Sequence, residues 1–153
     1  MNACDIELAL AKYFNYRIHL IVPNVFWGLG FNYELDLMVV SANNYATEIE
    51  IKTSVSDIKA ESKKRKSAHC SNKIKKFYFA VPEALKDKAL ELIPEKAGLF
   101  IVSPRLKVSI ARVPQLNKAA RPLTEQELKK LHELAAMRIW SLKEALLKKA
   151  KKL

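Results

Sequence analysis

The chain has few of the residues that interrupt regular structure. Its 153 residues include 3 glycines and 6 prolines, so we expect regular helices and strands joined by short loops. Two cysteines, Cys4 and Cys70, are too few for a disulfide framework, which favours a cytoplasmic location. No long uncharged apolar run is present, so we predict no membrane-spanning helix and no membrane partner. Asp5 and Glu7 stand where a signal peptide would be basic, so we predict none.

Acidic residues are fewer than basic ones. The 27 Lys and Arg residues against 16 Asp and Glu residues give a formal net charge of +11. This excess favours an acidic partner, and nucleic acid is the commonest one for such a domain. The residues are 50% hydrophobic, which predicts a folded chain rather than a disordered one. The length suits one domain with a real core.

The hydrophobic pattern predicts alternating helices and strands. Helices are expected over residues 5–14, 54–68, 83–92 and 124–149. Strands are expected over residues 16–22, two runs within 33–52, and residues 77–81, 99–102 and 107–113. Pro23 should end the first strand, and capping-box spacings at Ser54–Asp57 and Thr124–Glu127 should begin two of the helices. We therefore expect an α/β fold with a single mixed β-sheet flanked by helices.

One predicted strand carries charges where strands are usually apolar. Side chains alternate between the faces of a strand, so Glu48, Glu50 and Lys52 share one face. Ile49 and Ile51 point the other way, towards a core. The acidic pair and the lysine are thus held together on a rigid element.

The preceding strand has a similar pattern. Glu34, Asp36 and Met38 share one of its faces. A turn at residues 42–44 allows the two strands to form a hairpin. We therefore expect the two acidic faces to meet.

Asp36 and Glu50 could together bind Mg²⁺ or Mn²⁺. Hard cations take oxygen ligands, and Mg²⁺ commonly uses one or two carboxylates with water and substrate phosphate. The carbonyl of Ile51 is a further candidate ligand, and Lys52 could stabilise charge on a phosphate. The alternative is a solvated sheet face with cross-strand ion pairs.

These residues resemble the motif of a known enzyme superfamily. Asp36, followed one hairpin later by Glu50-Ile51-Lys52, is similar to the motif of the PD-(D/E)XK nucleases. The expected order of helix, three strands, helix and strand resembles their restriction-endonuclease-like core. Residues 50–59, 75–83 and 98–102 resemble MmcB-type DNA repair proteins of that superfamily, with related proteins in phages and mobile elements.

The resemblance implies a function and roles for four residues. Asp36 and Glu50 would bind the metal, Lys52 would act on the attacking water or the transition state, and Glu7 would assist the metal through water. The implied activity is metal-dependent hydrolysis of DNA phosphodiester bonds, in repair, recombination or mobile-element biology. DNA is preferred over RNA through this resemblance alone.

Several acidic residues keep alternative interpretations. Glu34 or Glu48 could replace one of the proposed ligands, because both lie on the same pair of strands. Asp57 could support the site, but its capping-box position explains it without function. Glu7 could equally be an exposed helix residue.

A basic run follows the acidic strands. A charge run is usually a solvated helix face, but its sign here matches a phosphate backbone, so we expect it to hold a nucleic-acid strand. Its candidate members are Lys59, Lys63, Lys64, Arg65, Lys66 and Lys73. Trp27, in a loop beside glycine, could stack on an unpaired base.

The C-terminal segment is expected to be one long helix. We divide the single domain into a core over residues 1–120 and this helix within residues 121–153. The helix could dock on the sheet or form a homodimer. Its predicted apolar stripe comprises Leu128, Leu131, Ala135, Ile139, Leu142 and Leu146.

Two alternatives to a nuclease remain open from the sequence. One is a non-catalytic nucleic-acid-binding module with the same fold. The other is an interaction protein that acts through its C-terminal helix, although this leaves the acidic strands unexplained.

Overall fold

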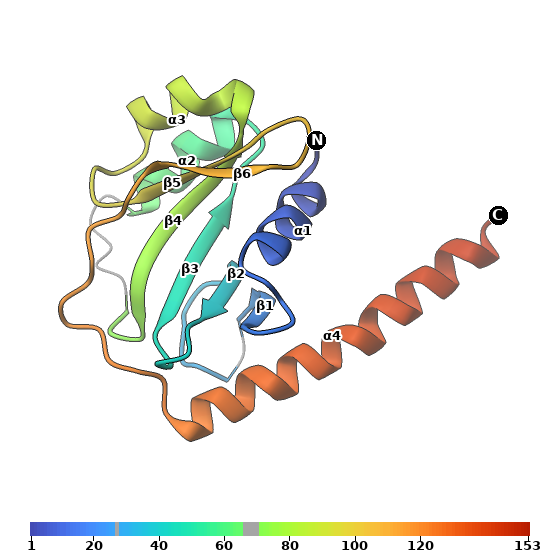
Figure 1. Cartoon of the computed structure of the whole chain (residues 1–153). Coiled ribbons are helices and arrows are strands. Elements are labelled where there is room, and N and C mark those ends of the chain that lie inside the picture. The colour runs from blue at the N-terminus through green and yellow to red at the C-terminus, as the bar shows by residue number, and fades with distance from the viewer. Residues whose placement is uncertain (27, 66–70) are drawn as a thin grey trace.

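A six-stranded sheet with helices on both faces forms the body of the protein (Figure 1). The structure, a computed structural model, describes residues 1–26, 28–65 and 71–153. The elements are α1 (Ala3–Tyr13), β1 (Leu20–Val25), β2 (Leu35–Val40), β3 (Ala46–Ile51), α2 (Val55–Arg65), β4 (Ile74–Pro82), the 3-10 turn η1 (Glu83–Leu85), α3 (Lys86–Leu92), β5 (Gly98–Val102), β6 (Val108–Arg112) and α4 (Glu125–Lys151).

The strands are ordered in space as they are in sequence, β1-β2-β3-β4-β5-β6. The pairs β1–β2, β2–β3 and β5–β6 are antiparallel, and β3–β4 and β4–β5 are parallel. Parallel neighbours need a crossover, which α2 and the η1–α3 segment supply. The prediction of one mixed sheet flanked by helices is confirmed, including the order of helix, three strands, helix and strand.

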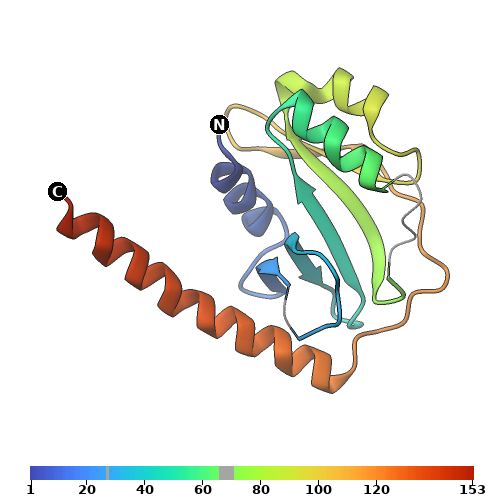
Figure 2. The ribbon, with the colours of Figure 1, turned by 180° about the vertical axis from the view of Figure 1, so that it is seen from behind.

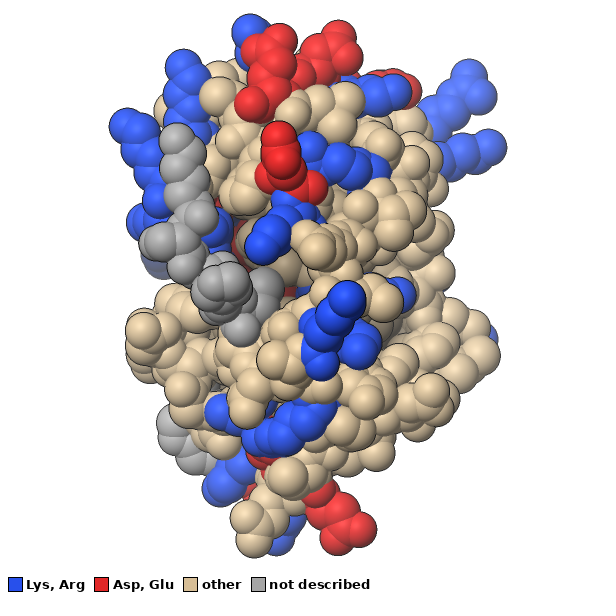
Figure 3. All heavy atoms as spheres, turned by 90° about the vertical axis from the view of Figure 1, so that its left-hand side faces the viewer, with Lys and Arg blue, Asp and Glu red and all other residues tan. Residues whose placement is uncertain are grey.

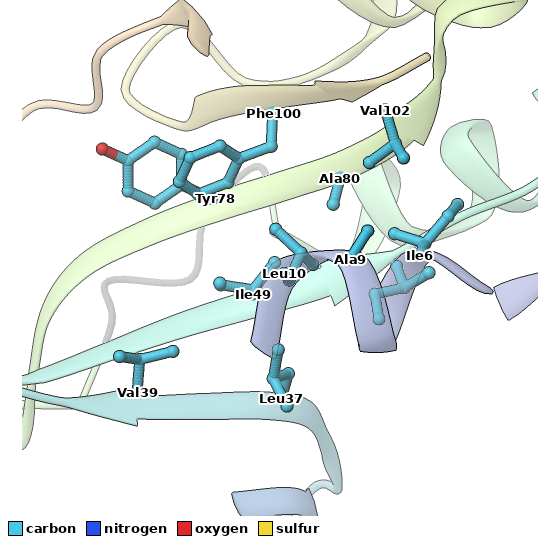
Figure 4. Packing of buried hydrophobic residues seen from close by; sticks show 11 residues of the cluster. Ile6, Ala9, Leu10, Leu37, Val39, Ile49, Tyr78, Ala80, Phe100 and Val102 are labelled. Atoms are coloured by element: carbon cyan, nitrogen blue, oxygen red, sulfur yellow. The ribbon is translucent and has the colours of Figure 1, made fainter. Parts of the chain in front are cut away.

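Helix α1 covers one face of the sheet. Its buried residues Ile6, Ala9 and Leu10 pack in a cluster that includes Ile49 and Phe100 (Figure 4). The asparagine before the helix caps it: Asn2 accepts a hydrogen bond from the backbone N–H of Asp5. The apolar side of β3 therefore faces α1, as the alternation predicts.

The opposite face is covered in two parts. Ile58 of α2 packs with Phe79 of β4, and Leu131 of α4 packs with Met38 of β2. Figure 2 shows α2 and α3 over one end of the sheet and α4 beside the other end. The acidic residues of β3 lie on this face, between the two parts, because Glu48 aligns with Met38 and with Phe77.

The first strand differs from the prediction at both ends. Asn15 adopts a left-handed conformation, with φ of 57°, and its carbonyl accepts hydrogen bonds from Ile18 and His19, so a turn precedes β1. Pro23 was expected to end the strand, but it pairs with Leu37 within β1. This prediction was wrong because β1 is an edge strand, where a residue without an N–H is tolerated.

The two predicted capping boxes both begin helices. At α4, Thr124 accepts from the backbone N–H of Glu127, and the Glu127 side chain accepts from the N–H of Thr124. At α2, Ser54 Oγ accepts from the N–H of Asp57 and donates to its carboxylate. Both the carboxylate and the backbone N–H of Asp57 are thus bonded to Ser54 at the start of α2. The last predicted residues of this helix, 66–68, lie outside the described part of the chain.

Helix α4 has two halves with different surroundings. Leu128, Leu131 and Ala135 belong to the core or pack against it, whereas Leu142 and Leu146 are exposed. Figures 1 and 2 show the second half extending past the sheet. The predicted stripe therefore docks only in its first half.

Candidate functional site

Asp36 and Glu50 converge on Lys52 at the end of β3. Lys52 Nζ lies 3.2 Å from Asp36 Oδ2 and 2.9 Å from Glu50 Oε2. The Asp36 side chain is 33% exposed and that of Glu50 only 4%. The predicted triad is thus assembled, with one carboxylate open to solvent and the other buried.

Ile51 contributes backbone groups to the same place. Its N–H donates to Asp36 Oδ2 at 2.8 Å, where the β2–β3 ladder has ended. The N–H and C=O of one strand residue point to the same side. The Ile51 carbonyl is therefore directed towards β2, the side on which Asp36 lies, as a further ligand would require.

Arg65 of α2 continues the ionic contacts into the interior. Its Nη2 donates to Glu48 Oε1 and lies 3.1 Å from Glu50 Oε1, and its Nε donates to Glu61 at 3.0 Å. Its guanidinium carbon lies 4.2 Å from the ring centroid of Tyr33 and 4.8 Å from that of Phe77. Arg65 is thus enclosed by two carboxylates of β3, one of α2 and two aromatic rings.

Together these groups form a connected cluster in which the described carboxylates outnumber the described cations. We call the following residues the carboxylate network: Asp36, Glu48, Glu50, Glu61, Lys52 and Arg65. Among the described residues, the four carboxylates contact Lys52, Arg65 and the exposed Lys64, whose Nζ lies 3.9 Å from Glu61 Oε2, so with every group ionised the carboxylates exceed the cations by one in a chain whose net charge is +11. Charges of one sign this close in a buried site are costly unless protons or a cation compensate them.

The pKa values reflect the burial of these groups first and the neighbouring charges second. Burial and the charge of Asp36 raise the pKa of Glu50 to about 8, although Lys52 opposes the rise. Burial also raises the pKa of Glu48 against the effect of Arg65. Burial lowers the pKa of Lys52, but Glu50 and Asp36 outweigh it and raise that pKa above its ordinary value. The site thus favours added positive charge.

Glu7 of α1 lies at the edge of the network. The side chain is partly buried, and its burial and the nearby charge of Asp36 raise its pKa. Glu7 is therefore close to the predicted metal site. It adds negative charge on the side of Asp36.

The donor set fits a hard divalent cation that keeps open positions. Among residues 1–26, 28–65 and 71–153, no three His, Cys, Asp or Glu side chains are grouped so as to hold a metal. Two carboxylates and a carbonyl leave room for water and phosphate oxygens, which is how Mg²⁺ is usually bound. Lys52 lies between the two carboxylates, so cation binding there requires its ammonium to give up a contact.

The other acidic alternatives are placed differently. Glu34 is exposed and accepts a hydrogen bond from Asn24, away from the network. Glu48 belongs to the network, but Arg65 and Tyr33 both donate to its carboxylate. The strand face is not solvated, because Glu48 is 0% and Glu50 3% exposed.

Of the predicted phosphate-contacting residues, those that the structure describes do not all lie on one surface. Lys59 and Lys63 are exposed on α2, and Lys64 is exposed beside Glu61. Arg65 differs from the expectation: it is 8% exposed and turned inwards. Arg65 lies on the same side of α2 as the buried Ile58. This position, and not its charge, decides that its side chain faces the interior.

Of the remaining three candidates, Lys73 is described and lies elsewhere. Lys73 precedes β4, whose first residue pairs with Ala46 at the start of β3. It is therefore at the opposite end of β3 from Lys52. Trp27 and Lys66 lie outside the described residues.

Sequence reasoning missed two members of the site, Tyr33 and Glu61. The helical spacing of Ile58, Ser62 and Arg65 places the arginine towards the sheet, and Glu61 is one turn before it. This pattern could have indicated an inward ion pair. The pairing with Glu48 could not be found, because it joins residues 17 apart in the chain.

Basic side chains are scattered over one side of the molecule, among many uncharged ones (Figure 3). Figure 3 shows Lys and Arg side chains spread over one side of the molecule, with Asp and Glu mostly near its upper and lower ends. Within the described residues, no helix combines the length and apolarity needed to cross a bilayer.

Comparisons with known proteins find a solved structure with a shared fold and a matching protein family. The solved structure of the SPO1766 protein of unknown function from Silicibacter pomeroyi is 20% identical and superimposes with a TM-score of 0.65. The match covers 95% of this chain and 91% of that one, and it shows a shared fold. A search of curated proteins gives no match. The family model described as DNA repair protein MmcB-like matches residues 6–146, so the chain belongs to the MmcB-like family.

Proposed function

We propose that this protein is a Mg²⁺- or Mn²⁺-dependent nuclease that hydrolyses DNA phosphodiester bonds, with Asp36, Glu50 and Lys52 as its catalytic residues. The observation that carries the proposal is the convergence of two carboxylates on one lysine, within a network whose described carboxylates outnumber its described cations. The family description names DNA repair. The resemblance of these three residues to the PD-(D/E)XK motif supports the choice of reaction.

Each residue has a distinct task in this proposal. Asp36 and Glu50 hold the cation, with the Ile51 carbonyl beside them and Glu7 contributing through water. A bound divalent cation supplies positive charge for the attacked phosphate and makes a coordinated water more acidic. Lys52, once released from one carboxylate, donates hydrogen bonds to the phosphate or to the attacking water.

The inner part of the network supports this arrangement. Arg65 contacts one oxygen of Glu50 while Lys52 contacts the other. Both oxygens are therefore oriented before any cation binds. Exposed Lys59 and Lys63 of α2 are suited to contact the DNA backbone without reading its sequence.

A second candidate function is a DNA-binding module without catalysis. The observation in its favour is that Lys52 already neutralises Asp36 and Glu50 at 3.2 and 2.9 Å. The remaining negative charge weighs against it, because a binder gains nothing from acids beside phosphate.

The test is cleavage of labelled single-stranded, duplex and branched DNA with Mg²⁺, with Mn²⁺ and with EDTA. Asp36→Asn and Lys52→Met should each reduce cleavage by roughly 10²-fold or more. Lys88→Met, at an exposed lysine of α3, is the matched control and should cleave almost normally. Absence of metal-dependent cleavage on every substrate, with salt-sensitive DNA binding retained, would select the binding module.

A further inference from the structure

The two carboxylate oxygens of Glu61 have different surroundings. Oε1 accepts a hydrogen bond from Arg65 Nε at 3.0 Å. Oε2 lies 3.9 Å from Lys52 Nζ and 3.9 Å from Lys64 Nζ, and both distances exceed the length of a hydrogen bond. Lys64 is 74% exposed, so its pairing with Glu61 is a weak surface contact. Within the described residues, Oε2 is therefore an acceptor that faces Lys52 without being bonded to it.

The Lys52 ammonium has one donor more than its two hydrogen bonds require. It has three N–H groups, and it donates to Asp36 Oδ2 at 3.2 Å and to Glu50 Oε2 at 2.9 Å. Among the described residues, Glu61 is the remaining carboxylate within ion-pair distance of Nζ. An approach of about 1 Å would form a charge-assisted hydrogen bond, and the flexible stem of a lysine allows such a shift.

The proposed function, on which this inference rests, requires another partner for this ammonium. Asp36 and Glu50 can offer their oxygens to a cation only if Lys52 gives up hydrogen bonds to them. The Lys52 side chain is 15% exposed, so an ammonium without a carboxylate partner would be costly there. Glu61 can receive it, because Glu61 is not one of the proposed ligands.

We propose that Glu61 is a positioning residue that receives the Lys52 ammonium when the proposed ligands bind a divalent cation. Arg65 keeps Glu61 in place for this role, because its guanidinium donates to Glu61 Oε1 and also to Glu50 Oε1. Lys52 thus exchanges carboxylate partners, keeps its charge and stays at the open side of the network.

The alternative is that Glu61 serves only to compensate Arg65. Glu61→Gln separates the two roles. Its amide oxygen can still accept from Arg65 Nε, while its amide nitrogen then faces Lys52 and offers no acceptor. A role towards Arg65 alone predicts no effect that depends on Lys52. A positioning role predicts an effect on cation binding that requires the lysine to be present.

The test is a double-mutant cycle on Mn²⁺ affinity, measured by titration calorimetry on the full chain. Glu61→Gln alone should weaken Mn²⁺ binding by roughly 10-fold, because the ammonium loses a charge-assisted hydrogen bond in the cation-bound state. In the Lys52→Met background the same substitution should weaken binding only about 2- to 3-fold, since the long-range attraction between charge and cation alone is lost. Equal weakening in both backgrounds would overturn the proposal.

A control and a stability measurement complete the experiment. Glu91→Gln removes the same charge from an exposed ion pair of α3 and should change Mn²⁺ affinity by less than about 2-fold. Urea denaturation without metal should show that Glu61→Gln remains folded, because the hydrogen bond to Arg65 is kept. A parent protein that binds no Mn²⁺ would overturn the proposed metal site together with this inference. Mn²⁺ binding that Glu61→Gln leaves unchanged would overturn this inference alone.

Discussion

The two cations of the carboxylate network have opposite surroundings. Arg65 is enclosed by Glu48, Glu61 and two aromatic rings, and its side chain is 7% exposed. Lys52 is 15% exposed and lies beside Asp36, the open carboxylate of the network. One cation is a fixed part of the interior, and the other can exchange partners.

The comparison separates structure from chemistry within one cluster. On the inner side, Arg65 and its partners compensate one another's buried charges. Removing one of these side chains would be costly, because the others would stay buried without a partner. On the outer side, Asp36 and Glu50 share one ammonium, that of Lys52. In the proposed function, a divalent cation and a phosphate would add to the compensation there.

The largest effect is expected from breaking the inner side. Arg65→Met leaves Glu48 buried without its cation, so the free energy of unfolding should fall by about 3–5 kcal/mol. Urea denaturation without metal measures this change. Lys63→Met, an exposed change on the same helix, should stay within about 0.5 kcal/mol of the parent. Equal effects of the two substitutions would contradict a structural role for Arg65.

The pH dependence of the free energy of unfolding should report on Glu50, which lies on the outer side of the network. The pKa of Glu50 is raised to about 8 in the folded protein, so folding favours its protonated form. This contribution is complete below the ordinary value of 4.5 and is lost as pH rises through about 8. Between these limits, stability without metal should fall by on the order of 1 kcal/mol per pH unit.

Urea denaturation from about pH 5 to about pH 8.5 measures this slope. Glu50→Gln should reduce it, because the amide does not titrate. Added Mn²⁺ should also reduce it, since cation binding stabilises the ionised carboxylate. A slope that is unchanged in Glu50→Gln would assign the effect to another group.

Removing the Lys52 ammonium should affect Mn²⁺ binding and DNA cleavage in opposite directions. Lys52→Met frees Asp36 and Glu50 from a competing ammonium, so Mn²⁺ should bind several-fold more tightly. Cleavage should nevertheless be lost. Titration calorimetry with Mn²⁺ measures the affinity, and Asp36→Asn should weaken it. Weaker Mn²⁺ binding in Lys52→Met would mean that the lysine holds the site open rather than competing for it.

The smallest effects are expected on the outer surface of α2. Lys59→Ala and Lys63→Ala should each weaken DNA binding a few-fold, equally for all sequences, and lower the salt slope by about 1. Fluorescence anisotropy at several salt concentrations measures both quantities. Lys88→Ala on α3 serves as a control with the same charge change. If Lys88→Ala weakens binding as much, the effect is one of net charge and not of position.

Much of the fold could be predicted because it depends on local pattern. Period-two alternation in β2 and β3 and the capping boxes at Ser54 and Thr124 indicated these elements and their order. The triad of Asp36, Glu50 and Lys52 was predictable because a hairpin and strand alternation bring the three together.

The remainder depended on contacts between distant segments. Strand β1 continues through Pro23 because it is an edge strand, and its position in the sheet is not a local property. Arg65 is of a residue type that is usually exposed, but α2 packs on the sheet with the side that carries Arg65 facing Glu48. The stripe of α4 continues into solvent because the sheet ends before the helix does.

The sequence by itself determined the α/β class, the acidic hairpin and the excess of basic charge, because each follows from residue types at short spacing. Only the tertiary structure decided which of these charges are buried and which lie at the open side. Packing of α2 on β3 gave Arg65 to the interior and left Lys52 at the open side. Burial then raised the pKa of Glu50, since desolvation acts on a carboxylate only when other parts of the chain exclude water from it.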